Sequence, residues 1–181
     1  MNAMSESTSG TDSTTHGKRA LPLVIVDASN VAFGNSGGVR RPTLAALNLV
    51  LEKIPGKDYE VRVLADASLR HRIDRREEYE ALVRSGVILQ TPAGRSADQF
   101  MAHLARKRRS EGQKVLILTN DLLRQNPDLE PLRATFLVVE EGEVIFDPPL
   151  EPVFSAPGEE STIPSRGDVA GLPDPVQELS F

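Results

Sequence analysis

Residues 24–34 read VIVDASNVAFG, a stretch in which an apolar run leads directly into polar residues. Leu23 and the three residues after it are branched aliphatic side chains of the kind that form a buried strand. The run then ends on a carboxylate, Asp27, and an amide, Asn30, follows three residues later. A buried strand that ends on a charged group needs a physical reason, and the rest of the chain supplies one.

Four further apolar runs share the character of the first. They lack the polar alternation of half-exposed strands, so they suit a parallel sheet that is covered on both faces. The five predicted strands are Leu23–Val26, Val61–Leu64, Val87–Leu89, Val115–Leu118 and Phe136–Val139. Helices are predicted between them at Pro42–Ile54, Asp74–Ser85, Ala97–Ser110 and Asp121–Arg133.

This alternation predicts an α/β fold: a three-layer α/β/α sandwich with a central, mostly parallel sheet of about five strands. The segment Phe136–Phe146, with Glu141 and Gly142 in its middle, is predicted as a terminal hairpin. At 181 residues the chain is long enough for one domain with a core of its own. We expect that domain at residues 21–150.

The two ends of the chain are predicted to be disordered tails. Residues 1–20 are rich in Ser, Thr and Gly, while residues 151–181 hold six acids, one arginine and five prolines. Such segments bury too little apolar surface to offset the entropy lost on ordering. The C-terminal tail has a net charge of −5, the charge of the whole chain, so the remainder is neutral. A protein partner for this tail stays open, as does a homo-oligomer.

The composition excludes several kinds of chemistry. There is no cysteine, which removes disulfides, thiol catalysis and thiolate zinc sites, and the three histidines are widely scattered. No run approaches the roughly 20 apolar residues of a membrane span, and the N-terminus has no apolar stretch typical of a signal peptide. A cytoplasmic protein without membrane contact is therefore expected.

Carboxylates follow the predicted strands. Asp27 ends the first strand, Asp66 the second and Asp121 the fourth, and Asp98 begins the helix after the third. Parallel strands present their carboxyl ends at one edge of the sheet, where ligands bind at the reversal of strand order. Carboxylates gathered there repel one another unless a cation compensates, and their oxygens suit Mg²⁺ or Mn²⁺. The sequence thus predicts a metal site at this edge, and Asp27 ends its strand to help form it.

Each of these residues also has a structural interpretation. An Asp after a strand commonly caps a helix, Asn30 can close a turn, and Asp98 can complement a helix dipole. The basic clusters Arg70–Arg76 and Arg106–Arg109 are ambiguous in the same way, since they could bind phosphates or simply be solvated helix faces.

Four motifs in order resemble the PIN-like NYN ribonucleases, particularly the regnase group of metal-dependent endoribonucleases. The motifs are VIVDASNVAFG, VILQTPAGRSADQF, VLILTNDLLR and FLVVEEGEVIFDPP, which begin at residues 24, 87, 115 and 136. The resemblance covers about residues 22–150. It implies a PIN-like fold and the hydrolysis of phosphodiester bonds in RNA, mainly single-stranded.

The resemblance also implies roles for individual residues. Asp27, Asp98 and Asp121 match the acids that bind Mg²⁺ and orient the attacking water, and Asn30 matches the amide that supports them. Arg124 matches a basic residue just beyond the last acid.

The sequence departs from the regnase pattern at several positions. Ala97 stands where regnases carry a second acid, and Gln125 stands where another acid is frequent. Asp66 is acidic where regnases are not, so it is a further candidate metal ligand. The regnase zinc finger is absent, as the lack of cysteine requires.

We therefore expect an Mg²⁺- or Mn²⁺-dependent endoribonuclease that uses the three matched acids and Asn30. The candidate RNA-binding residues are Arg124 and Arg95 beside the metal, and Arg70, Arg72 and Arg75 in the first basic cluster. One alternative is a PIN-like module that binds RNA or protein through a degenerate site. Another is a phosphoacceptor signalling domain, which would need paired acids after the first strand.

Overall fold

The computed structural model describes residues 20–34, 41–139 and 142–150. The predicted tails therefore lie outside the described residues, apart from Ala20, and so do Glu140 and Glu141 of the predicted hairpin. In chain order the elements are β1 Leu23–Asp27, α1 Ala28–Phe33, α2 Leu44–Lys53, β2 Glu60–Ala65, the 3₁₀ helix η1 Leu69–His71, α3 Arg76–Arg84, β3 Ile88–Gln90, α4 Ala97–Ser110, β4 Val115–Leu118, the 3₁₀ helix η2 Pro127–Leu132, β5 Arg133–Val138 and β6 Val144–Asp147.

The sheet confirms the predicted α/β class. Its strand order is β3-β2-β1-β4-β5-β6, with β6 antiparallel to β5 and every other pair parallel. The six strands are one more than the five expected, because the predicted hairpin adds β6 to the edge. Strand order reverses between β1 and β4, so the site expected for a ligand lies at the carboxyl ends of these two strands.

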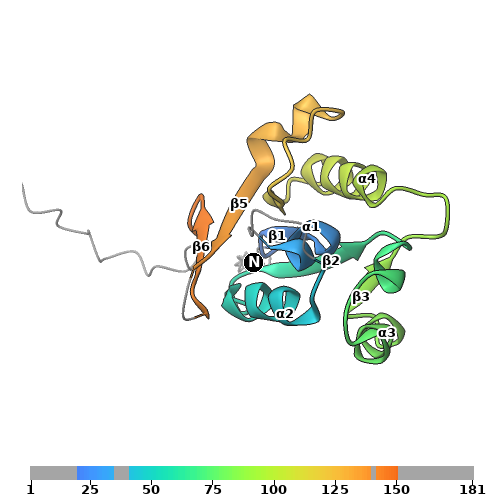
Figure 1. The fold of residues 1–181 in the computed structure, drawn as a ribbon. Coiled ribbons are helices and arrows are strands. Elements are labelled where there is room, and N and C mark those ends of the chain that lie inside the picture. The colour runs from blue at the N-terminus through green and yellow to red at the C-terminus, as the bar shows by residue number, and fades with distance from the viewer. Residues whose placement is uncertain (1–19, 35–40, 140–141, 151–181) are drawn as a thin grey trace, which may run out of the picture.

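Helices cover both faces of the sheet (Figure 1), and β1 shows why. All five of its residues are buried, and the four aliphatic ones alternate between two hydrophobic clusters. Val24 and Val26 pack with residues of α1, α2 and α3, while Leu23 and Ile25 pack with residues of α4 and η2. A strand buried on both faces has no room for polar alternation, as its sequence indicated. Among the described helices, none combines the length and hydropathy needed to cross a membrane.

Two features of the backbone differ from the expectation. The segment Asp121–Arg133 was predicted as an α-helix and is instead a turn followed by η2, because Pro127 and Pro131 remove backbone donors and Leu123 adopts a left-handed φ of 49°. The short helix α1 was not among the helices predicted from the sequence.

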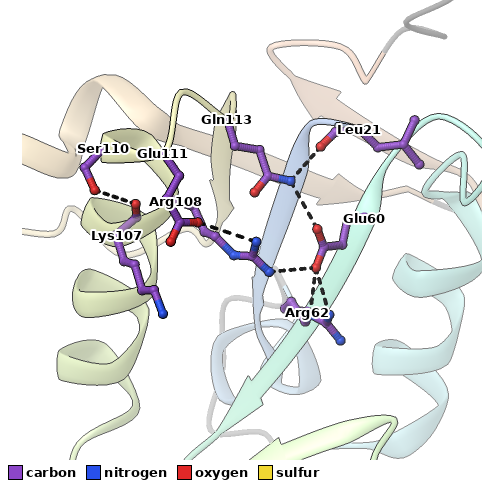
Figure 2. Close-up of polar contacts among 8 residues, drawn as sticks. All are labelled: Leu21, Glu60, Arg62, Lys107, Arg108, Ser110, Glu111 and Gln113. Atoms are coloured by element: carbon purple, nitrogen blue, oxygen red, sulfur yellow. Dashed lines mark hydrogen bonds and ion pairs between the residues drawn. The ribbon is translucent and has the colours of Figure 1, made fainter. Parts of the chain in front are cut away.

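The amino edge of the sheet is held by a polar network around Glu60 (Figure 2). The Gln113 side chain donates to the Leu21 carbonyl at 2.7 Å and to Glu60 at 3.1 Å. Arg108, on α4, and Arg62 also donate to Glu60, at 3.2 Å and 3.0 Å. This network joins α4 to the start of β2, at the end of the sheet opposite the strand-end acids.

Candidate active site

Asp27 is the buried centre of the candidate site, with only 7% of the residue exposed. It ends β1 and caps α1, because its Oδ1 accepts the backbone N–H of Asn30 at 3.0 Å. Its Oδ2 accepts the hydroxyl of the fully buried Thr119, which follows β4, at 3.0 Å. Asp27 is therefore both a helix cap and a link between the two central strands. The structural interpretation of this residue and its predicted place at the sheet edge are both correct.

Amide groups extend this link. The Asn30 Oδ1 accepts the backbone N–H of Asn120 at 2.8 Å, so the predicted supporting amide fixes the segment that precedes Asp121. The Asn120 side chain bonds both the N–H and the carbonyl of Phe136 on β5, at 3.1 Å and 3.0 Å. Asn120 thus continues the β4–β5 pairing with its side chain and connects it to α1 through Asn30.

Asp66 and Asp98 are joined through the start of α4. The Asp66 Oδ1 accepts the backbone N–H of Ala97 at 2.8 Å, and its own N–H lies 3.4 Å from the Ser29 hydroxyl. Ser96 caps α4 by accepting the N–H of Asp98 at 3.1 Å. Asp66 therefore positions the helix that carries Asp98, and its carboxylate keeps a second oxygen available.

Asp121 lies on the wall of a cleft of about 410 Å³. Its Oδ1 accepts the backbone N–H of Leu123 at 2.8 Å. This bond closes a tight turn at Leu123, whose φ is left-handed. The residues that line the cleft are Asp98, Asn120, Asp121, Leu122, Leu123, Arg124, Gln125 and Asn126. The structure thus brings Asp98, Asp121 and Arg124 around one open space.

The four acids influence one another electrostatically. Burial raises the pKa of Asp27 from 3.8 to about 6, and the charges of Asp98 and Asp66 add to this rise against the hydrogen bonds from Asn30 and Thr119. Burial also raises the pKa of Asp98, with further contributions from the charges of Asp66 and Asp121. The edge of the sheet therefore concentrates negative charge that the nearby residues only partly compensate.

The donor set suits a hard divalent cation. All the candidate ligands are carboxylate oxygens. A cation among them would offset the repulsion that, in addition to burial, raises the pKa values of Asp27 and Asp98. Within residues 20–34, 41–139 and 142–150, no three His, Asp or Glu side chains lie close enough together to enclose an ion. Mg²⁺ usually keeps several waters and binds through one or two carboxylates together with substrate phosphates. The spread of the acids therefore fits such an ion.

The predicted RNA-binding arginines differ in how they are engaged. Arg124 lines the cleft, and Arg95 lies in the exposed loop before α4, where its carbonyl accepts the Thr91 hydroxyl at 3.1 Å. Arg75 pairs with Glu78 at 3.3 Å, and the Arg72 guanidinium lies 4.8 Å from the centre of the Phe33 ring. Arg70, by contrast, lines a separate small cavity that also contains Arg84.

Thr119 and Asn120 are site residues that the sequence interpretation missed. Both precede Asp121 in the motif LILTND, in which only the acid was singled out. The available signal was the threonine itself, because a polar residue that ends a fully apolar run needs a partner when it is buried. Arg84, at the end of α3, left no comparable signal.

The fold and the site together define a class: an α/β protein with coupled acids at the carboxyl edge of a parallel sheet, where strand order reverses. The comparison with protein families is more specific. Residues 20–136 match the model of the Zc3h12a-like ribonuclease NYN domain, and the chain belongs to this family. The resemblance identified from the four motifs is thus confirmed, and a ribonuclease function follows at the level of the family.

Two further comparisons add little. The curated proteins gave no significant match. Among solved structures, one that matches is a mutant of Rae1 (YacP) from Bacillus subtilis, with 15% sequence identity and a TM-score of 0.39. The matched region spans 62% of this chain and 67% of the Rae1 chain. A likeness this slight has no bearing on function.

Proposed function

We propose that this protein is a metal-dependent endoribonuclease that hydrolyses phosphodiester bonds of mainly single-stranded RNA in the cytoplasm, with Mg²⁺ or Mn²⁺. The observation that carries the proposal is the placement of four acids at the carboxyl edge of the sheet, where Thr119 links Asp27 to Asp121 and Asp66 bonds the residue before Asp98. A ribonuclease of this family needs a cation at that edge, both for its own carboxylates and for the anionic substrate.

Asp27, Asp98 and Asp121 would hold the ion, one or two of them by direct contact and the others through its waters, with Asp66 as a further candidate ligand. When bound, the ion supplies a deprotonated water near neutral pH and offsets charge on the phosphate in the transition state. Thr119 and Asn30 hold the Asp27 carboxylate in one orientation, so little reorganisation is needed when the substrate arrives. Arg124, in the cleft, and Arg95, in the loop before α4, would contact the phosphates beside the scissile bond.

The test is cleavage of a fluorescent single-stranded RNA by the full chain, with Mg²⁺, with Mn²⁺ and with EDTA. Asp27→Asn should abolish the metal-dependent cleavage while circular dichroism shows an unchanged fold, because asparagine keeps an oxygen to cap α1. Asp58→Asn, in the turn before β2 at the opposite edge, is the matched control and should cleave like the wild type. Cleavage that persists in Asp27→Asn would refute the site assignment.

A second candidate function is supported by Ala97 and Gln125, which stand where regnases carry acids. In this reading the domain binds RNA or protein through a degenerate site and does not cut. Calorimetry with Mn²⁺ separates the two, because a degenerate site should bind no ion at millimolar concentrations. The phosphoacceptor alternative has no support, since a single acid follows β1 and the chain belongs to a ribonuclease family.

A further inference from the structure

A second cavity lies beside the catalytic edge, between α3 and β3. Its volume is about 180 Å³, and it is lined by Arg70, Glu80, Val83, Arg84 and Gln90. Gln90 is the last residue of β3, so the cavity lies toward the carboxyl ends of the parallel strands, as the four acids do. Pockets that enclose small-molecule ligands usually measure about 300–1,000 Å³. A cavity this small suits one group of a longer ligand, with the remainder outside.

The cavity has an excess of positive charge. Its one carboxylate, Glu80, is already paired with Arg76 at 2.8 Å. A hydrogen bond from Arg76 lowers the pKa of Glu80, and the charges of Arg76, Arg70 and Arg84 lower it further. Three guanidinium groups therefore surround one acid. Among the described residues, neither Arg70 nor Arg84 has an ion pair or hydrogen bond of its own.

Arg70 carries a more specific signal. Its Nε is buried and has no hydrogen-bond partner among the described residues. A buried donor without a partner costs free energy, and the cost is greater when the group is charged. An anion seated against this guanidinium would offset that cost. A phosphate group matches the planar donor array of arginine in particular.

One buried side chain lies near both the cavity and the acids. Tyr79 is fully buried, and its hydroxyl donates to the Gln90 Oε1 at 3.4 Å. Burial raises the pKa of Tyr79 to about 12, the charge of Arg70 opposes this rise and that of Asp66 adds to it. Arg70 and Asp66 thus act on the same hydroxyl from nearby positions, and Asp66 in turn bonds the residue before Asp98.

We propose that this cavity is a phosphate subsite, in which Arg70 and Arg84 bind a backbone phosphate of RNA close to the scissile bond. The subsite rests on the proposed function and extends it. With Arg124 in the cleft beside β4 and the arginine pair beside β3, a single strand crosses the carboxyl edge of the sheet over the four acids. The ligand is one phosphodiester group of a strand that continues on both sides.

The first test measures the affinity of the full chain for a fluorescent single-stranded RNA in EDTA across a salt series. Arg84→Ala and Arg70→Ala should each flatten the slope of log affinity against log salt by roughly 0.7, and the double variant by about 1.4. Lys57→Ala, which removes one positive charge from the exposed turn before β2 at the opposite edge of the sheet, should keep the wild-type slope. If the Arg84→Ala slope equals that of the control, the subsite does not exist. Arg84 is exposed, so this result does not depend on whether Arg70→Ala folds.

The second test locates the contact. One uncharged methylphosphonate linkage is moved along the RNA, and the wild type should lose affinity where that linkage faces the cavity. The same replacement should cost the Arg84→Ala variant no affinity at that position, whereas a loss equal to that of the wild type would exclude the contact. Neither test requires catalysis, so a protein that binds as described but never cuts refutes the proposed endonuclease and leaves the subsite in place. An acidic peptide of residues 151–181 that binds the wild type and not Arg84→Ala, while both proteins bind RNA with the same salt slope, would assign the cavity to protein and overturn the inference.

Discussion

The hydroxyl of Thr119 donates to the Oδ2 of Asp27 at 3.0 Å, so the end of β4 fixes a carboxylate at the end of β1. The same hydroxyl oxygen accepts the backbone N–H of Asp121 at 3.2 Å. One buried side chain thus serves both central acids. Their relative positions are set by the core of the sheet, and the surface loops contribute less.

Thr119→Val should therefore destabilise the fold and impair the site together. Valine keeps the shape but leaves the Asp27 oxygen and the Asp121 N–H without this partner, a cost of roughly 1–3 kcal/mol. Urea unfolding measures that cost. Thr119→Ser keeps the hydroxyl and should retain most of the stability. Equal stability in Val and Ser variants would show that the hydroxyl bond contributes little.

Asp27→Asn should stabilise the metal-free protein at neutral pH. Because the pKa of Asp27 is raised from 3.8 to about 6 in the folded state, ionisation there disfavours folding. The wild type should lose stability as the pH rises between these two values, by about 3 kcal/mol at most, and the variant should not. Thermal unfolding from pH 3 to 8 in EDTA measures the difference, with Asp58→Asn as control. Mn²⁺ should raise the Tm of the wild type and of Asp58→Asn, and should leave the Tm of Asp27→Asn unchanged.

Glu60 should contribute stability of the opposite pH dependence. Burial raises its pKa, but the hydrogen bond from Gln113 and the charges and hydrogen bonds of Arg108 and Arg62 outweigh burial, so the pKa lies below its ordinary value of 4.5. This stability is present above pH 4.5 and is lost as the pH falls through the folded pKa. Glu60→Gln should therefore be less stable than the wild type at pH 7 and converge with it in acid. If the stabilities of Glu60→Gln and the wild type differ by the same amount at every pH, the lowered pKa of Glu60 is contradicted.

Arg106→Ala should slow cleavage clearly and lower the free energy of unfolding only slightly. The guanidinium binds Asp128 through two bonds of 2.8 Å and 2.7 Å and also donates to Asn126, so it holds η2 and the turn that carries Asp121. The side chains of Arg106 and Asp128 are both about half exposed, and exposed ion pairs contribute little to folding. Hydrogen exchange should rise in residues 121–132. Arg106→Lys keeps the charge without the paired geometry and should resemble Ala in cleavage, whereas wild-type rates in both would exclude a positioning role.

Arg124→Ala and Arg95→Ala should weaken RNA binding or slow cleavage without removing the ion. Each lost phosphate contact should flatten the salt dependence of affinity by roughly 0.7. Mn²⁺ calorimetry should give the wild-type affinity in both variants, which separates phosphate contacts from metal ligation. Unchanged slopes and rates would place the RNA path elsewhere, across the arginines near β3.

The sequence predicted elements that depend on local patterning. Val115–Leu118 and Ala97–Ser110 match their predicted bounds, because a continuous apolar run and a serine cap are both local signals. The gathering of acids at one edge followed from the topology of parallel strands. The prediction of an α-helix at Asp121–Arg133 was wrong because two prolines and a residue with left-handed φ outweigh the apolar content of this segment.

The sorting of the arginines depended on tertiary contacts and could not be predicted from the sequence. The Arg72 guanidinium already packs on the ring of Phe33 in α1, which lies 39 residues earlier in the chain. Arg84 and Arg70 meet only because α3 packs beside η1. Charge clusters in a sequence do not reveal which cations already have partners. The structure therefore alters the choice of RNA-binding arginines more than it alters the choice of acids at the site.

Asp27 and Asp121 follow the two central strands, whereas the arginines near the site lie on helices and loops at the rim. These two sets of residues face different evolutionary constraints. A change at a buried acid disturbs a helix cap and an interstrand link, while a change at a rim arginine disturbs little else. A lineage could therefore diverge toward new RNA targets by exchanging rim residues, with the hydrolytic chemistry inherited intact.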